Sequence, residues 1–190
     1  MDDPRHPFDR ALLLARLRRA APGIADADFL LERSAEDFAE RLRIVQRTFV
    51  MGADIGSRHG VAARALAGMP NVVTIVSLDP CAELLARAPM PRVLADEEAL
   101  PFADASLDLA VSALSLHLVN DLPGTLAQIR RALKPDGLLL ASLLGGNTLT
   151  ELRQSWLAAE SEIEGGASPR VAPFLDVRQA GALLQRAGFA

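Results

Sequence analysis

From residue 50 onward, the chain alternates between runs of consecutive apolar residues and segments with apolar residues every three or four positions. Continuous runs are typical of parallel strands covered on both faces, and the spaced pattern is typical of amphipathic helices. We expect five strands, at residues 50–54, 72–78, 92–95, 107–112 and 137–144. Strands that alternate with helices in this way predict an α/β protein with a doubly wound, mostly parallel sheet.

Two helices are expected ahead of the first strand, one over residues 8–21 and one that starts at Ser34. We therefore divide the chain into an N-terminal helical extension, residues 1–48, and a domain built on the sheet, residues 49–190. The first helix carries four arginines, which fit a solvated face better than a surface for an acidic partner. These are Arg10, Arg16, Arg18 and Arg19.

Polar residues or glycines follow four of the predicted strands, at the edge where doubly wound sheets bind ligands. Asp54 precedes a turn bracketed by Gly56 and Gly60, where the backbone can approach a ligand and the next helix offers free N–H groups. Asp79 ends the second strand and suits a ribose diol. The third and fourth strands are followed by Asp96, Glu97 and Glu98, and by Ser112, Ser115 and His117.

Each of these groups also has a simpler structural interpretation. An aspartate at a strand end is often a helix cap or a turn former. The acidic run at Asp96 could be a solvated loop, and His117 could be a partly buried structural imidazole. Their occurrence in chain order at successive strand ends favours a shared small-molecule site, with a pocket lined by Gly56, Asp79, Asp96 and Ser112 together.

Other kinds of site lack their sequence signatures. The dinucleotide fingerprint G-x-G-x-x-G does not fit the turn from Gly56 to Gly60, and no G-K-[ST] phosphate loop is present. The three histidines, His6, His59 and His117, are scattered and show no metal-ligand spacing, so we expect no metal site.

Composition narrows the expected partners and compartment. The net charge of −4 and the absence of a polybasic block argue against nucleic acid. The longest apolar run, near residues 138–144, is far below the roughly 20 residues that a membrane span needs. The acidic N-terminus does not resemble a signal peptide, and the single cysteine, Cys81, fits a reducing compartment and a packing role. We expect a cytoplasmic protein.

Several segments resemble the class I S-adenosylmethionine-dependent methyltransferases. They are Asp54-Ile55-Gly56, Asp79, residues 95–102 and residues 107–112. A narrower resemblance is to the complex I assembly factor 5 family, an arginine hydroxylase group, and to its bacterial relatives, which are similar to the malonyl-carrier-protein methyltransferase of biotin synthesis. It is carried by Phe8-Asp9-Arg10 and residues 112–123, 133–137, 145–153 and 164–170. The resemblance implies a Rossmann-like methyltransferase fold with strand order 3-2-1-4-5.

The resemblance also implies a cofactor, S-adenosylmethionine, and a role for each site residue. The turn, with Asp54, Gly56, Ser57, Arg58 and Gly60, would face the amino-acid end of the cofactor. The remaining assignments are Asp79 to the ribose, Asp96 and Glu97 to the adenine, Ser112 and Leu114 to the methionine portion, and His117 to the reacting end as the one catalytic candidate.

Two features depart from the methyltransferase pattern. Arg58 replaces the usual central glycine of the turn, where its side chain would either narrow the pocket or pair with the cofactor carboxylate. The chain also ends before the C-terminal β-hairpin that normally lies beside the fifth strand. The fifth strand should then form the sheet edge, and we expect it to mediate self-association as a homodimer or by aggregation.

The expected function is that of an S-adenosylmethionine-dependent methyltransferase-like enzyme that modifies a protein or a small molecule. The alternative is a complex I assembly factor that hydroxylates arginine or acts without catalysis. Arg58 and the missing hairpin favour the alternative. The acceptor itself is not readable from the sequence.

Overall fold

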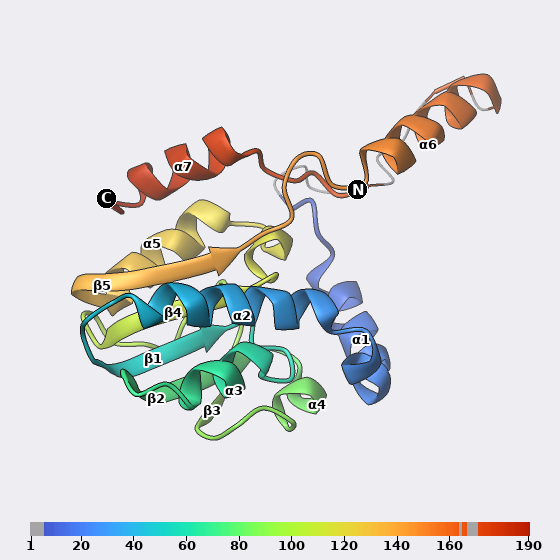
Figure 1. Ribbon diagram of the computed structural model, residues 1–190. Helices are drawn as coiled ribbons and strands as arrows, with labels where there is room; N and C mark the ends of the chain where they lie inside the picture. The colour runs from blue at the N-terminus through green and yellow to red at the C-terminus, as the bar shows by residue number, and fades with distance from the viewer. Residues whose placement is uncertain (1–5, 164, 167–170) are drawn as a thin grey trace.

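A five-stranded parallel sheet forms the centre of the molecule (Figure 1). The computed structural model describes residues 6–163, 165–166 and 171–190, so most of the motif at 164–170 lies outside the described residues. The strands are β1 (Phe49–Ile55), β2 (Val72–Asp79), β3 (Arg92–Leu94), β4 (Leu107–Ala113) and β5 (Leu133–Ser142). Their order is β3-β2-β1-β4-β5, which confirms the predicted fold class and topology.

Helices cover both faces of this sheet. The α-helices are α1 (Arg10–Ala20), α2 (Phe29–Arg43), α3 (Val61–Ala67), α4 (Ala82–Leu85), α5 (Leu122–Ala132), α6 (Thr150–Ile163) and α7 (Val177–Arg186). The short 3₁₀ helices are η1 (Ala21–Asp26) and η2 (Leu116–Leu118). Within the described ranges, none of these helices is long and apolar enough to cross a membrane.

Two apolar clusters hold the layers together. On one face, α2 and α3 pack through Phe38 and Leu66 against Phe49 at the start of β1. On the other face, α5 packs through Leu126 and Ile129, and partly buried residues of α7 join the same cluster. Helix α6 projects away from the body of the molecule (Figure 1). The two layers leave the carboxyl ends of the strands free to form a site.

The N-terminal helix α1 lies near that carboxyl edge (Figure 1). Leu14 and Leu17 of α1 pack with Cys81 and Leu84 at the start of α4. Cys81 is buried and free, which agrees with the packing role expected from the sequence. The predicted N-terminal extension therefore contacts the strand ends directly.

Helix α2 begins at Phe29, so the prediction that it starts at Ser34 is wrong. Asp28 occupies the N-cap position, and the hydroxyl of Ser34 donates to the carbonyl of Leu30 one turn earlier in the helix. A serine in a helix interior can satisfy its hydroxyl in this way. The same hydroxyl accepts a hydrogen bond from Ser142, which links α2 to β5.

Strand β5 begins at Leu133 rather than at Gly137. Its pairing with β4 shifts in register between Leu107 and Leu109, so the strand contains an irregularity over residues 134–137. Asp136 has a positive φ of 60° at this point. Strand β5 is the last strand of the sheet, as expected.

Candidate functional site

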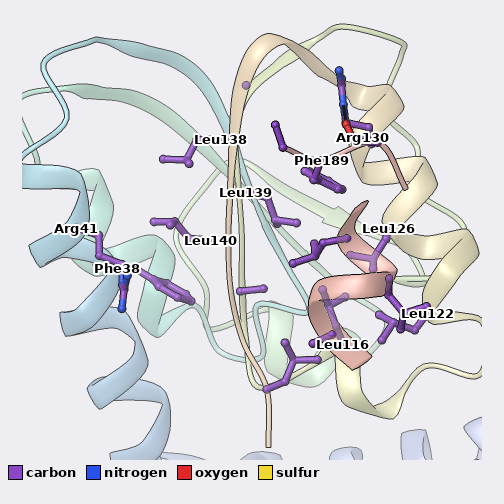
Figure 2. A pocket seen from close by; sticks show the side chains of 18 of the residues that line it. Phe38, Arg41, Leu116, Leu122, Leu126, Arg130, Leu138, Leu139, Leu140 and Phe189 are labelled. Carbon is purple, nitrogen blue, oxygen red and sulfur yellow. Dashed lines mark hydrogen bonds between the residues drawn. The ribbon is translucent and has the colours of Figure 1, made fainter. Parts of the chain in front are cut away.

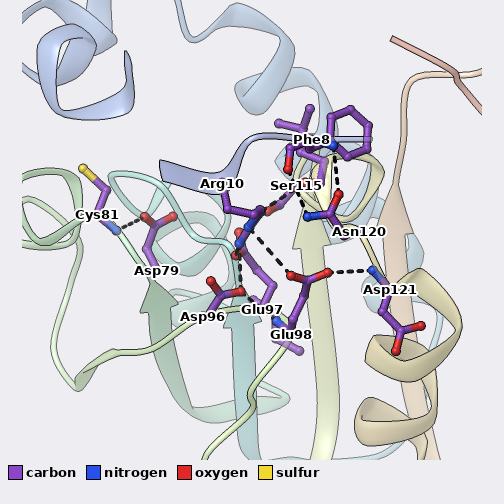
Figure 3. Close-up of polar contacts among 12 residues, drawn as sticks. Phe8, Arg10, Asp79, Cys81, Asp96, Glu97, Glu98, Ser115, Asn120 and Asp121 are labelled. Atoms are coloured by element: carbon purple, nitrogen blue, oxygen red, sulfur yellow. Dashed lines mark hydrogen bonds and ion pairs between the residues drawn. The ribbon is translucent and has the colours of Figure 1, made fainter. Parts of the chain in front are cut away.

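Polar side chains from the end of β2, the loop after β3 and the segment after β4 meet at one edge of the sheet (Figure 3). Arg58 joins them from the turn after β1. We call the group formed by Arg10, Arg58, Asp79, Glu97 and Ser115 the strand-end cluster. Asp79 and Glu97 are 0% and 1% exposed, respectively. Parallel strands bring their carboxyl ends to a common edge, which explains why residues far apart in the sequence become neighbours.

Arg58 lies at the centre of the strand-end cluster. Its backbone N–H and its Nη1 both donate to Oδ2 of Asp79, at 2.8 and 3.1 Å. Its Nη1 is also 3.6 Å from Oε1 of Glu97, and its Nη2 donates to the hydroxyl of Ser115 at 3.2 Å. The side chain therefore crosses the site and pairs with carboxylates of the protein itself.

Arg10 of helix α1 closes the cluster from the outside. Its Nη2 lies 2.8 Å from Oδ1 of Asp96 and 2.5 Å from Oε2 of Glu97, and its Nη1 donates to the carbonyl of Leu118. The interpretation of this arginine as part of a solvated face is therefore wrong. The amide of Asn120 fixes the preceding segment through two hydrogen bonds with the backbone of Phe8 (Figure 3).

The two carboxylates differ in their ionisation because they have different partners. Burial raises the pKa of Asp79, and the opposing effect of Arg58 and two backbone N–H donors does not cancel it. Burial also acts on Glu97, but the charges of Arg58 and Arg10 and the hydroxyl of Ser115 hold its pKa below the usual value. Glu97 is thus the anion on which both arginines converge.

The glycine turn is filled by the chain itself. Gly56 and Gly60 have positive φ values of 69° and 82°, which glycine adopts without strain. A Cβ atom on Gly56 would lie 2.0 Å from the hydroxyl oxygen of Ser115, and one on Gly60 would lie 2.5 Å from Pro89. The close approach that glycine allows is therefore used by neighbouring side chains of the protein.

Asp54 lies next to the cluster but does not join it. Its Oδ2 accepts a hydrogen bond from the N–H of Ala63 at the start of α3, and its Oδ1 has no hydrogen-bond partner among the described residues. Complete burial raises the pKa of Asp54 to about 7, and the nearby charge of Asp79 adds to this effect. Ser57, whose hydroxyl is likewise buried and without a partner in the described ranges, is in the same turn.

The residues after β4 form a second group. The hydroxyl of Ser112 donates to the carbonyl of Ile55 within the sheet, and Leu114 has a strained positive φ of 52°. The ring of His117 meets the ring of Phe174 edge to face, with the centroids 5.8 Å apart. Burial, and secondarily the charge of Arg58, lowers the pKa of His117 to about 4. His117 is therefore a neutral imidazole at physiological pH.

The space at this edge is small. A cavity of about 30 Å³ is lined by Arg10, Arg58, Asp96, Glu97 and nearby apolar side chains. This is roughly the volume of one water molecule, about 30 Å³, whereas small-molecule pockets measure about 300–1,000 Å³. Of the four residues expected to line a shared pocket, Asp96 borders this cavity, whereas Gly56, Asp79 and Ser112 do not.

A much larger cavity, of about 620 Å³, lies along β5 (Figure 2). Leucines of the strand line it on both faces of the sheet, together with Phe38 and Arg41 of α2 and Phe189 at the C-terminus. It contains none of the predicted site residues. Across the described ranges, no group of three or more His, Cys, Asp or Glu side chains is arranged to hold a metal ion.

Asp79, Glu97, Ser115 and Arg58 were recognisable as site residues from the sequence, but Arg10 was not. Arg10 was not recognised because its contact with Asp96 spans 86 positions and leaves no local signal. The motif Phe8-Asp9-Arg10 was noted as part of the family resemblance, and this was the one feature that pointed to the segment.

The fold and the polar strand ends define a class I methyltransferase architecture, and comparison with known proteins agrees. A methyltransferase domain family matches residues 53–141. Among solved structures, an S-adenosylmethionine-dependent methyltransferase from Thermotoga maritima superposes with a TM-score of 0.66 at 19% identity, over 91% of this chain and 79% of that one. At this identity, the structural likeness establishes the fold alone.

Two curated relatives narrow the assignment. The mouse (Mus musculus) protein "Arginine-hydroxylase NDUFAF5, mitochondrial" is 42% identical over 189 residues, which cover 96% of this chain and 55% of the mouse protein. The malonyl-[acyl-carrier protein] O-methyltransferase of Methylovorus sp. (strain MP688) is 35% identical over 92% of this chain and 63% of that protein. This chain thus spans between half and two thirds of these relatives.

The domain match, the curated relatives and the structural neighbours support a class I S-adenosylmethionine-dependent methyltransferase family for this chain. Both resemblances predicted from the sequence, to the complex I assembly factor 5 group and to the malonyl-carrier-protein methyltransferases, are confirmed. The domain match and the methyltransferase neighbours also support the expected family cofactor, S-adenosylmethionine.

Binding of S-adenosylmethionine requires acceptors for its hydroxyl and amine groups and space for its nucleoside. The carboxylates of Asp79 and Glu97 are suitable acceptors for hydroxyl and amine groups, but their oxygens are already bonded to Arg58, Arg10, Ser115 and the N–H of Cys81. The adjoining cavity is also too small for a nucleoside. The donor chemistry is appropriate, but the cofactor does not fit this arrangement of side chains.

Proposed function

We propose that this chain is the cofactor-binding part of an S-adenosylmethionine-dependent methyltransferase-like enzyme that modifies a protein or a small acid. One observation carries the proposal: Asp79, a fully buried carboxylate, ends β2 beside a glycine turn and opposite Glu97. The domain match supports it. The relatives named above are longer than this chain, so their substrates are extended to it only as proposals.

In this proposal, the site residues keep the roles that the sequence suggested. Asp79 accepts from the ribose hydroxyls, Asp96 and Glu97 face the adenine, and the turn from Gly56 to Gly60 faces the amino-acid end. When bound, the cofactor supplies a methyl group on an activated sulfonium. Entry of the cofactor requires the guanidinium group of Arg58 to leave the carboxylate of Asp79.

A second candidate is an assembly role of the type implied by the complex I assembly factor 5 group. The observation that favours it is Arg58, because this arginine occupies the site that a methyl donor would need. The mouse relative is named as an arginine hydroxylase. For this chain, we propose that role as the alternative to methyl transfer.

Two measurements test these proposals. Calorimetry with S-adenosylhomocysteine, the demethylated cofactor, tests binding, and an absence of heat at any concentration contradicts the cofactor proposal. Mass spectrometry then follows an arginine-containing peptide and a malonyl-carrier protein after incubation with the chain and S-adenosylmethionine. The gain of a methyl group supports the first function. The gain of an oxygen atom from O2, in a parallel incubation that also contains a reductant to take the second oxygen atom to water, supports the second.

Two further features of this proposal concern the whole protein. A reducing, cytoplasmic location is consistent with the single buried Cys81. A homodimer through the outer edge of β5 is consistent with the place of this strand at the end of the sheet. Both are part of the proposed function.

A further inference from the structure

We infer that Arg58 and Arg10 form a built-in arginine lock in the place of the cofactor, so that ligand binding requires both guanidinium groups to leave Asp79 and Glu97. This inference rests on the proposed function, because the ligand in question is S-adenosylmethionine or its demethylated product. It concerns two residues of this chain for which the methyltransferase fold by itself provides no role.

The carboxylate oxygens of Asp79 and Glu97 already have hydrogen-bond partners within the protein. Both oxygens of Asp79 are bonded, Oδ2 to the backbone and side chain of Arg58 and Oδ1 to the N–H of Cys81. Both oxygens of Glu97 are likewise engaged, Oε1 by Ser115 and Oε2 by Arg10. A ribose or an adenine amine can bond these atoms only by replacing the present donors.

The arginines also supply positive charge next to the buried carboxylates of Asp79 and Glu97. Asp79 and Glu97 are almost completely buried, and a buried carboxylate without a cationic partner is strongly unfavourable. The guanidinium of Arg58, whose side chain is 7% exposed, supplies that charge from within the cluster. The arginines therefore stabilise the ligand-free state, and a cationic cofactor would have to compensate for their loss.

The outer arginine of the cluster, Arg10, belongs to helix α1, which has few buried contacts with the rest of the molecule. Arg10 is at the start of α1, a helix with no fully buried residue, and the segment before it is fixed by the amide of Asn120. Elements with few buried contacts open at low cost in free energy. Release of Arg10 is therefore coupled to movement of α1 away from Glu97, and it leaves the core of the sheet intact.

The test compares the affinity of S-adenosylhomocysteine for the full chain and for three variants by calorimetry. We expect Arg58→Gly to bind about tenfold more tightly or better, because a lock lowers the apparent affinity by the fraction of molecules that are open. Arg10→Ala, in which Arg58 is retained, should also bind more tightly. Arg16→Ala, an exposed arginine of the same helix, is the matched control and should bind like the wild type.

The outcomes separate this inference from the proposed function. Equal affinity of the wild type, Arg58→Gly and Arg10→Ala overturns the lock and leaves cofactor binding intact. Weaker binding by Arg58→Gly also overturns the lock and makes Arg58 a cofactor ligand. An absence of binding by every variant, with folding verified by circular dichroism, overturns both the lock and the proposed function.

A second measurement does not depend on any substitution. Amide hydrogen exchange of residues 8–20 is measured in the wild-type chain with and without S-adenosylhomocysteine. The lock predicts faster exchange in this segment when ligand is bound, because α1 loses its contacts with Asp96 and Glu97. Slower or unchanged exchange at saturating ligand contradicts the role of Arg10.

Discussion

Arg58 combines a strained backbone with a satisfied side chain. Its φ of 52° is in the left-handed region, which costs a residue with a Cβ roughly 1–2 kcal/mol. Its side chain meanwhile contacts Asp79, Glu97 and Ser115. The strain persists because those contacts hold the turn in place, and sparsely populated backbone conformations of this kind concentrate at functional sites.

Residue-scale prediction from sequence succeeded for the acidic members of the site. Asp79 and Asp96 were recognisable because each directly follows a predicted strand, and the sheet order then brings them to one edge. The direction of the Arg58 side chain was not predictable, since either orientation satisfies the local sequence. It is decided by Glu97 and Ser115, which are distant in the chain.

Substitution of Asp79 tests its role as the ribose acceptor. Asp79→Ala should weaken binding of S-adenosylhomocysteine by about 1–3 kcal/mol, the usual effect of removing a charged hydrogen-bond partner. Calorimetry measures the change, and Asp104→Ala, an exposed carboxylate away from the cluster, is the control. An unchanged dissociation constant would show that Asp79 serves only as a structural partner of Arg58 and Cys81.

Asp54 predicts a pH dependence of stability. Its pKa rises from 3.8 to about 7 on folding, so the folded chain holds a proton that the unfolded chain has lost between these values. Stability from this group is present in full below pH 3.8 and is lost as the pH rises towards 7.

Asp54→Asn imitates the protonated form and should remove this contribution to the pH dependence. The difference in the free energy of unfolding between wild type and variant should change by a few kcal/mol across the window. Urea unfolding at several pH values measures it. Parallel pH profiles for the two proteins would show that Asp54 does not titrate in this range.

At the scale of elements, sequence patterns located the strands and helices but misplaced some of their ends. Apolar periodicity identified α2, yet its first turn was missed because Ser34, a common capping residue, lies inside the helix and bonds Leu30. Residues 135–137 are part of β5, whose pairing with β4 continues through an irregularity to Leu133. The start of α2 reflects local hydrogen bonding within the helix, whereas the start of β5 reflects its pairing with β4.

Strand β5 carries the prediction of self-association. Its outer edge has no neighbouring strand in the described sheet, and its face borders the larger cavity. Sedimentation at several concentrations should reveal an associated species. Ala141→Lys, at an exposed position of the strand, should weaken association by about 0.2–1 kcal/mol per pair of facing lysines.

A matched control is Ala65→Lys, which adds the same charge to an exposed position of α3 away from β5. It should leave association unchanged. A wild-type chain that sediments as a monomer at every concentration would rule out pairing through this edge.

At the scale of the whole molecule, layer architecture and strand order follow from the sequence, whereas the size of the site does not. Alternating strands and helices leave few topologies open, and the family resemblance selected the observed order. The volume at the carboxyl edge depends on how two arginine side chains from different segments lie. No periodicity or motif encodes that arrangement.

The buried position of Arg58 has a consequence for the rate at which a ligand enters. If the guanidinium group must depart before the nucleoside can dock, association proceeds through a rare open form. In stopped-flow mixing, the observed rate for the wild type should then level off at high ligand concentration, at the rate of opening. In Arg58→Gly the rate should level off at a higher value, because only Arg10 must still leave Glu97 before the ligand enters.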